Sequence, residues 1–278
     1  MGVPAPPEAR EIPGSVSCRV CAQPAPLFFS KLILGRRKVG YYKCPACGHV
    51  QTETPYWLQE AYQNTNFQSD VGMAGRSIWT AQTTTALAYR LGIGPAEPCL
   101  DWGAGTGLLV RLCRDDGLNF FYDDPFAENV FARGFERKES GLPPAWACVT
   151  AFEVAEHLPD PLKNFGDLFQ LSPRHLLFST LLYQDQAPDW WYFVDNGQHV
   201  AFYTRRSLEL IARHYGYHLA SNDCDLHLFS REKVSDRLLK SCHKSREKLA
   251  RRYRKKHGSR LLKDFEHITR QLQVKAQD

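Results

Sequence analysis

Four cysteines near the N-terminus are spaced as zinc ligands. They form two Cys-x-x-Cys pairs, Cys18 with Cys21 and Cys44 with Cys47, and 22 residues separate the pairs. This spacing is typical of two tight turns that present four thiolates to one zinc ion, and Gly48 lets the second turn pass beneath the metal. Four protein ligands leave no open position, so we expect the zinc to stabilise the fold. The competing interpretations are four incidental buried cysteines and a redox pair, but neither pair lies at a strand-to-helix turn.

A glycine-rich loop in the middle of the chain is spaced for a nucleotide-like cofactor. A short apolar lead ends in the sequence Asp101-Trp102-Gly103-Ala104-Gly105-Thr106-Gly107, and an apolar helical run follows. Glycines let the backbone approach a ligand closely, and the N-terminus of the next helix favours anionic or polar groups. The Gly-x-Gly-x-Gly spacing differs from the Gly-x-Gly-x-x-Gly fingerprint of dinucleotide-binding folds. The loop therefore indicates a different cofactor.

Two later segments extend this pattern. An apolar stretch that begins at Phe120 ends in Asp123 and Asp124, and residues 152–161 read Phe-Glu-x-x-Glu-His-x-x-Asp-Pro. Together with the glycine loop, these segments resemble class I S-adenosylmethionine-dependent methyltransferases, in particular relatives of the ubiquinone-biosynthesis O-methyltransferases. The zinc ribbon ahead of them is similar to that of deoxysugar C-methyltransferases. The resemblance covers about residues 15–230.

The resemblance implies S-adenosylmethionine as the cofactor. The residues that it assigns to cofactor binding are Asp101, Gly103, Gly105, Gly107, Asp123, Asp124, Phe152 and Glu153. Of the two adjacent acids we favour Asp124, just before a proline, as the carboxylate that accepts both hydrogens of the ribose diol. Asp123 is the alternative.

The resemblance also predicts the architecture. We expect an α/β fold in which a Rossmann-like, seven-stranded, mostly parallel sheet carries helices on both faces. The predicted domains are a zinc ribbon (residues 1–54), a methyltransferase domain with its N-terminal helices (55–230) and a helical C-terminal extension (231–278). Within the second domain the apolar spacing predicts helices near residues 56–62 and 74–91 and a buried strand over 175–182.

Two histidines are the candidates for proton transfer. A sulfonium methyl group is already electrophilic, so we expect positioning of the acceptor and exclusion of water to supply most of the catalysis. A hydroxyl acceptor would need a general base, and His157 and His199 are the candidates because each lies on a loop expected at the carboxyl edge of the sheet. A bracing role is the alternative for His157. Some related O-methyltransferases bind a divalent metal at this turn, which here would use Glu153, Glu156 and His157.

Aromatic and basic side chains elsewhere could complete the site. Trp190, Trp191 and Tyr192 either line the acceptor pocket or belong to the core. Tyr62 and Arg76 precede the glycine loop, and by position they could close over the cofactor.

Charge is distributed unevenly along the chain. The formal net charge is +5, but residues 231–278 carry 16 Lys and Arg against 6 Asp and Glu, which leaves a net charge of −5 for residues 1–230. The apolar spacing of this extension predicts amphipathic helices broken near Gly258, with a basic run over 251–257. Nucleic acid, an anionic membrane surface and a partner protein are all compatible with this run, as is a solvated face of a helix packed on its own domain.

Composition excludes several classes of protein. Hydrophobic residues make up 43% and charged residues 23% of the chain, which is typical of a globular fold and not of a disordered or fibrous one. The sequence shows neither an apolar stretch long enough for a membrane span nor a signal peptide, and nine unevenly placed cysteines do not form a disulfide framework. We therefore expect a cytoplasmic protein without a transmembrane segment.

Three functions are consistent with these features. The first is methylation of a small-molecule acceptor, sugar or glycan-related, at oxygen or carbon. The second is RNA methylation, with the ribbon and the basic extension binding RNA. The third is a non-catalytic adaptor that retains the fold, and the intact glycine loop and Asp124 argue against it. We favour the small-molecule methyltransferase, because the body of the chain resembles zinc-ribbon methyltransferases of the kind that include deoxysugar C-methyltransferases. The net acidic charge of residues 1–230 argues against RNA.

Overall fold

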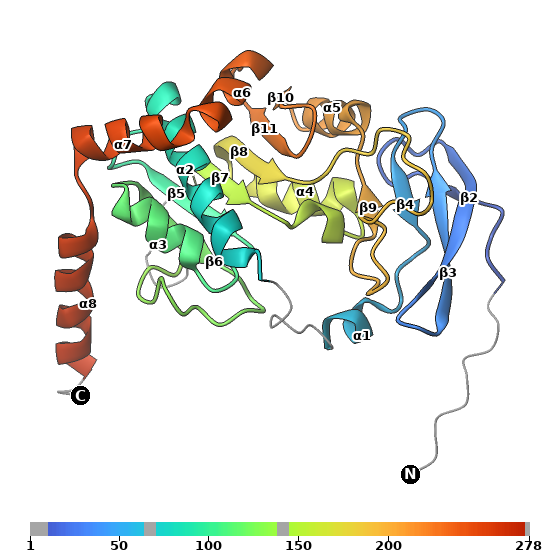
Figure 1. Cartoon of the computed structure of the whole chain (residues 1–278), viewed down its shortest axis with the longest axis horizontal. Helices are drawn as coiled ribbons and strands as arrows, with labels where there is room; N and C mark the ends of the chain where they lie inside the picture. Colours follow the sequence, from blue (N-terminus) through green and yellow to red (C-terminus); the bar gives the residue numbers. More distant parts are fainter. Residues whose placement is uncertain (1–10, 64–70, 138–144, 276–278) are drawn as a thin grey trace, which may run out of the picture.

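The computed structural model describes residues 11–63, 71–137 and 145–275 (Figure 1). Its central sheet has, in spatial order, β10 (His218–Ser221), β11 (Leu226–Ser230), β8 (Pro173–Ser179), β7 (Trp146–Ala151), β5 (Pro98–Trp102) and β6 (Asn119–Asp123). The last four strands in this order run parallel to one another, β11 is antiparallel to β8, and β10 is antiparallel to β11. The fold is thus an α/β fold with a mixed sheet.

The predicted seventh strand is not confirmed, because the described residues contribute six strands to this sheet. At the outer edge of β6, Tyr122 forms a single parallel bridge with Glu136. The stretch between β6 and this bridge consists mostly of turns and bends, so the described chain reaches strand geometry there at one residue. Residues 138–144, which follow, lie outside the described part of the chain.

The parallel strands place the predicted site at one edge of the sheet. All six residues of β7 are buried, as are three of the five in β5, as expected for strands inside a parallel sheet, and the buried residues include the polar Asp101 and Thr150. The carboxyl ends of parallel strands meet at the same edge. The glycine loop follows β5 and the Glu-His turn follows β7, so the topology brings the two together.

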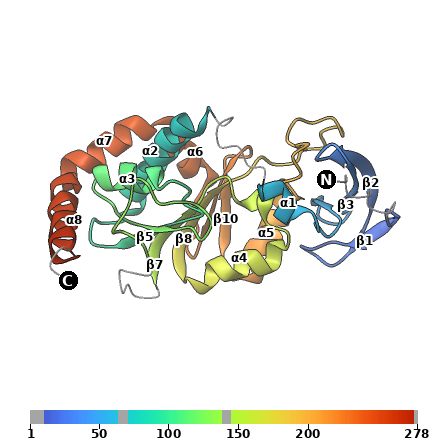
Figure 2. The same ribbon diagram turned by 90° about the horizontal axis from the view of Figure 1, so that it is seen from below.

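Helices cover both faces of the sheet (Figure 2). One face carries α2 (Met73–Leu91), α3 (Leu108–Asp115), α6 (Asp236–Lys244) and α7 (Arg246–His257), and the other carries α4 (Pro161–Gln170) and α5 (Arg205–His214). Helix α2 ends at Gly92, whose φ of 71° is the left-handed conformation that glycine adopts without strain. None of the helices in the described ranges has the length and apolar character needed to cross a bilayer.

The N-terminal region forms a second sheet. It contains β1 (Ser15–Ser17), β2 (Pro24–Ile33), β3 (Arg37–Lys43) and β4 (Val50–Thr52). Its fifth strand is β9 (Ala201–Phe202), which lies much later in the sequence. Each neighbouring pair is antiparallel. The short helix α1 (Leu58–Gln63) leads away from this sheet, and Trp57 just before it donates a hydrogen bond to the Gly197 carbonyl at 2.8 Å.

The C-terminal helices attach to the body in two steps. Helix α7 buries Leu249, Ala250 and Tyr253. The Tyr253 hydroxyl donates a hydrogen bond of 3.0 Å to the carbonyl of Ile93, which lies just after the end of α2. The chain then turns at Gly258, where φ is 78°, and continues as α8 (Leu261–Lys275) along the side of the molecule. The break predicted near Gly258 is therefore present.

Candidate active site

The glycine loop has a backbone that only glycine adopts easily. Gly103, Gly105 and Gly107 have φ values of 72°, 55° and 80°, all in the left-handed region. A Cβ on Gly103 would lie 2.8 Å from a methyl group of Val154, whereas a Cβ on Gly105 would meet nothing within 4 Å. The open space over Gly105 is therefore where a ligand can approach the backbone of the loop.

Hydrogen bonds tie this loop to the end of β6. The N–H of Gly103 donates to the Asp123 carbonyl at 2.9 Å, and the N–H of Gly105 donates to the Asp124 carboxylate at 2.8 Å. The same carboxylate accepts from the backbone of Phe126 at 2.8 Å. The Asp123 carboxylate instead pairs with Arg137 at 2.7 Å. Of the two acids, Asp124 is thus the one whose carboxylate lies against the glycine loop.

Asp101 supports the loop from within the sheet. Its carboxylate is buried and accepts a hydrogen bond from the Thr150 hydroxyl on β7 at 2.6 Å. Burial raises the pKa of Asp101 to about 7, although the hydrogen bond from Thr150 works in the opposite direction. In this structure Asp101 joins β5 to β7 beneath the loop.

The Glu-His turn after β7 holds a strained residue. Glu153 has a φ of 55°, which is unusual for a residue with a side chain. The Ser179 hydroxyl at the end of β8 accepts from the Glu153 N–H at 2.8 Å and donates to its carboxylate at 2.7 Å. The Arg76 side chain on α2 lies 4.0 Å from the other carboxylate oxygen. Ser179 was not singled out in the sequence, where it is one residue of an apolar strand.

Beyond this turn, Glu156, His157 and His199 converge. One potential ligand atom of each residue lies within 4.8 Å of the others, although His199 is 42 positions from His157. Burial raises the pKa of Glu156 to about 8, and the nearby charge of Glu153 contributes to this increase. Burial also lowers the pKa of His157 to about 4 and that of His199 to about 3, so both imidazoles are neutral near pH 7. The sequence named both histidines but not their contact.

Aromatic residues surround this cluster on two sides. The ring of Tyr192 lies 4.4 Å from that of His199, and the ring of Tyr62 lies 6.2 Å from that of His157. Tyr192 is buried, whereas Trp191 has 69% of its surface exposed and packs edge-on against Tyr192 at 5.4 Å. Phe152 contacts Trp79 of α2 at 6.5 Å. Among the predicted aromatic residues, Tyr192 lies closest to the two histidines.

The four N-terminal cysteines also come together. The Sγ atom of Cys21 lies 3.4 Å from that of Cys44 and 3.6 Å from that of Cys47, and Cys18 lies 3.6 Å from Cys47. A tetrahedral zinc with Zn–S bonds of about 2.3 Å needs sulfur atoms about 3.8 Å apart, so the cluster fits this ion after a small expansion. Gly48 has a φ of 74°, a left-handed conformation that glycine adopts without strain.

The fold and the site define an α/β protein with a cofactor loop at the carboxyl edge of its sheet. A family model described as a methyltransferase domain matches residues 78–222, just over half of the sequence. The chain belongs to this methyltransferase family, and the prediction that it is an S-adenosylmethionine-dependent methyltransferase is confirmed. No curated protein matches the chain.

Several solved structures are similar to the chain at low identity. Magnesium protoporphyrin IX methyltransferase from Synechocystis PCC 6803, with bound S-adenosylhomocysteine, is 16% identical with a TM-score of 0.41, over 63% of this chain and 95% of that one. The 1,6-didemethyltoxoflavin-N1-methyltransferase of Burkholderia thailandensis is 14% identical with a TM-score of 0.45, over 72% and 96%. Human N-acetylserotonin methyltransferase is 13% identical with a TM-score of 0.41, over 64% and 66%.

Proposed function

We propose that this chain transfers the methyl group of S-adenosylmethionine to a small-molecule acceptor, sugar or glycan-related, at oxygen or carbon. The observation that supports the proposal most directly is the position of Asp124, whose carboxylate lies 2.8 Å from the backbone nitrogen of Gly105 beside open space. A ribose placed there would meet both the carboxylate and the loop backbone. When bound, S-adenosylmethionine supplies a methyl group that is electrophilic without further activation.

The protein's own contribution would be binding, orientation and exclusion of water. Gly103, Gly105 and Gly107 shape the cofactor cradle, and the Asp124 carboxylate accepts hydrogen bonds from the sugar of the cofactor. His157 and His199 lie on the proposed acceptor side, the region of the Glu156, His157 and His199 side chains. Because burial lowers the pKa of both imidazoles well below 7, we assign to them the orientation of a hydroxyl acceptor and not its deprotonation. Tyr192 packs against His199 and limits the water that reaches the two rings.

Calorimetric titration with S-adenosylhomocysteine tests the proposal. We expect the wild-type protein to bind and Asp124→Asn to bind about 10- to 100-fold more weakly, because hydrogen bonds to a charged group contribute about 1.5–3 kcal/mol. Asp167→Asn, an exposed aspartate on α4, is the matched control and should bind normally. No binding to the folded wild-type protein would refute the proposal.

We propose further that Cys18, Cys21, Cys44 and Cys47 hold one structural zinc ion as thiolates. The sulfur separations of 3.4–3.6 Å support this, and four protein ligands leave no position for a substrate. Metal analysis of purified protein should return one zinc per chain, and Cys44→Ser should lose it. Wild-type protein that folds fully without zinc would contradict this assignment.

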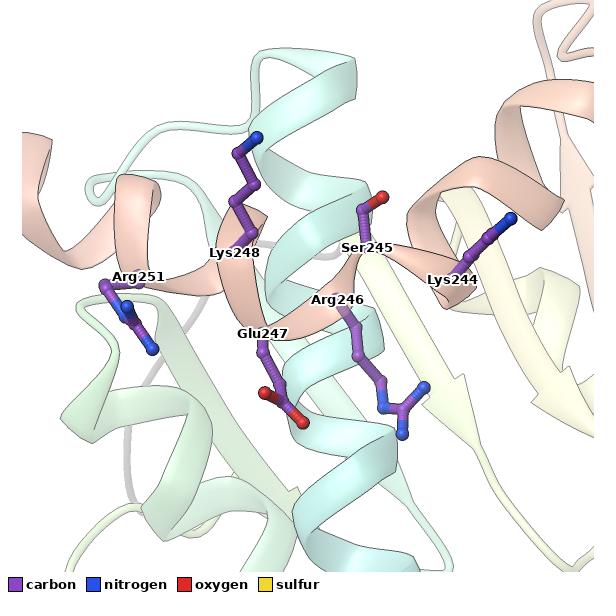
Figure 3. A pocket seen from close by; sticks show the side chains of 6 residues that line it. All are labelled: Lys244, Ser245, Arg246, Glu247, Lys248 and Arg251. Carbon is purple, nitrogen blue, oxygen red and sulfur yellow. The ribbon is translucent and has the colours of Figure 1, made fainter.

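A second candidate, an RNA acceptor, rests on one surface. A pocket where α6 meets α7 is lined by Ser245, Glu247 and four basic residues, Lys244, Arg246, Lys248 and Arg251 (Figure 3). Lys244 and Lys248 point to one side of α7, away from Arg246 and Glu247. Arg252, also exposed, follows one helical turn after Lys248. Clustered Lys and Arg side chains can neutralise the phosphates of a nucleic-acid backbone.

Fluorescence anisotropy with a labelled single-stranded RNA distinguishes this candidate. If RNA is the acceptor, binding should weaken steeply with salt, and the double variant Lys248→Gln, Arg252→Gln should bind more weakly than Lys163→Gln on α4. Equal binding by the two variants, or none by the wild type, would leave the small-molecule acceptor as the proposal.

A further inference from the structure

We infer that Glu156, His157 and His199 form a binding site for a divalent first-row transition metal ion, and that this ion binds a hydroxyl oxygen of the methyl acceptor. The catalytic half of this inference rests on the proposed function, whereas the metal site itself does not. The ligand set differs from the one expected from the sequence, because His199 takes the place of Glu153.

The two histidines are oriented as metal ligands are. Nδ1 of His157 lies 3.1 Å from the Gln198 carbonyl, and Nδ1 of His199 lies 3.0 Å from the Tyr192 carbonyl. A carbonyl oxygen can only accept, so each Nδ1 carries the hydrogen and each Nε2 keeps its lone pair. A hydrogen bond from the second ring nitrogen to a carbonyl is the usual way in which a protein fixes a ligating imidazole. Gln198 adds support, since its side-chain amide donates to the Ala61 carbonyl at 3.0 Å.

One oxygen of the carboxylate in this cluster lacks a hydrogen-bond partner in the described part of the chain. Glu156 is 1% exposed, and its Oε2 atom has no hydrogen-bond partner among the described residues. A buried carboxyl oxygen without a partner destabilises the folded protein, because it has lost its hydrogen bonds to water and has no hydrogen bond to replace them. A cation bound between the three side chains would satisfy it, since one potential ligand atom of each lies within 4.8 Å of those of the other two.

Glu153 is unsuited to the same site in this structure. Its carboxylate accepts from Ser179 on β8 and faces Arg76 on α2, so both oxygens are directed toward other partners. Its φ of 55° holds that direction. The three remaining ligands, two imidazoles and one carboxylate, favour manganese, iron, cobalt, nickel or zinc over magnesium or calcium, which prefer oxygen ligands.

Three protein ligands leave coordination positions for an acceptor. A hydroxyl bound to the ion would release its proton more readily, because a divalent cation stabilises the conjugate base. In the transfer, the acceptor oxygen forms a bond to the methyl carbon while the carbon–sulfur bond breaks, the sulfonium becomes a neutral thioether, and the hydroxyl proton passes to water. In this arrangement the histidines position the acceptor through the metal and are not the base.

Titration with cobalt(II) tests the site without turnover. The protein is first loaded with one zinc per chain to fill the cysteine cluster, and cobalt is then added in a calorimeter and in a visible spectrophotometer. We expect one cobalt per chain, with a d–d spectrum of nitrogen and oxygen ligands and without the thiolate charge-transfer band that would signal replacement of zinc. His199→Gln and Glu156→Gln should each weaken cobalt binding at least about tenfold, the effect that loss of even an outer-shell partner produces.

His218→Gln, an exposed histidine on β10, is the matched control and should bind cobalt as the wild type does. Thermal melting of each variant verifies that it is folded. No cobalt binding beyond the cysteine cluster in the folded wild-type protein, or wild-type affinity in both site variants, overturns the inference. Binding of S-adenosylhomocysteine is measured on the same samples. If only S-adenosylhomocysteine binding fails, the proposed function is refuted and the metal site stands. If only cobalt binding fails, the metal site is refuted and the proposed function stands.

Discussion

The attachment of helix α8 depends on one buried carboxylate. Asp264 is 4% exposed and accepts two hydrogen bonds from Arg114, at 2.8 and 2.6 Å, and one from Arg111 at 2.8 Å. Arg114 is itself 2% exposed, and its guanidinium lies 3.7 Å from the centre of the Phe135 ring. Asp264→Asn keeps the shape of the side chain but leaves the Arg114 charge buried without its partner. Breaking a buried pair in this way costs about 3–5 kcal/mol.

The sign of the pH dependence follows from the same contacts. Burial raises the pKa of Asp264, but the hydrogen bonds from Arg114 and Arg111 outweigh it and hold this pKa below its ordinary value of 3.8. A lowered folded pKa means that the pair stabilises the protein fully above that ordinary value, and that the contribution disappears as the pH falls through the folded pKa. The difference in free energy of unfolding between the wild type and Asp264→Asn should therefore become smaller in acid.

Urea unfolding of the wild type and Asp264→Asn, at pH 7 and at successively lower pH, measures this difference. The matched control is Asp115→Asn on α3. That carboxylate pairs with Arg111 at 2.9 Å but is 36% exposed, so its loss should cost at most about 1 kcal/mol. If Asp264→Asn lowers the free energy of unfolding no more than Asp115→Asn does, the buried pair does not anchor α8. The same conclusion follows if the difference between the wild type and Asp264→Asn stays unchanged at low pH.

Three further predictions concern glycine and zinc. Gly105→Ala should cost about 1–2 kcal/mol of stability, because an alanine is strained at a φ of 55°, but it should fold, because the added Cβ meets open space. It should weaken S-adenosylhomocysteine binding about tenfold through lost backbone contacts, as calorimetry would show. Gly117→Ala should destabilise the protein by about 1–3 kcal/mol in urea, since its Cβ would lie 2.3 Å from the Gly258 carbonyl, whereas Gly75→Ala in α2 should be neutral or stabilising. Removal of zinc by a chelator should lower the Tm and the strand content measured by circular dichroism, and retention of both would contradict a structural role.

The elements around the glycine loop could be predicted because short-range chemistry determines them. Gly103, Gly105 and Gly107 all adopt positive φ, and the predicted second helix ends at Gly92. The adjacent acids at the end of β6 illustrate the limit of such reasoning. Both positions follow from the sequence, but only the packing of β6 beside β5 turns Asp124 toward the loop and Asp123 toward Arg137.

The cluster of Glu156, His157 and His199 could not be predicted, because it depends on contacts between distant segments. The sequence places Glu153, Glu156 and His157 within one turn, so a prediction from the motif assigns all three to the same site. In the folded chain, the backbone of Glu153 is turned toward Ser179, and its place beside Glu156 is taken by His199, from a loop beyond β8. Periodicity reports which face of an element is buried, but it carries no information on which loops meet at the edge of a sheet.

Hydrogen bonds connect the N-terminal sheet to the cluster of Glu156, His157 and His199. Strand β4 of the ribbon pairs with β9, and just before β9 the N–H of Val200 donates to the Glu156 carbonyl at 2.8 Å while its own carbonyl accepts from Thr52 at 3.1 Å. Next to β9, the Thr204 hydroxyl donates to the Cys47 carbonyl at 2.6 Å. Val200, which follows His199, thus links Glu156 to strand β4 of the N-terminal sheet. If the four cysteines bind zinc as proposed, the metal would stabilise the sheet that holds this loop in position and would take no part in the chemistry.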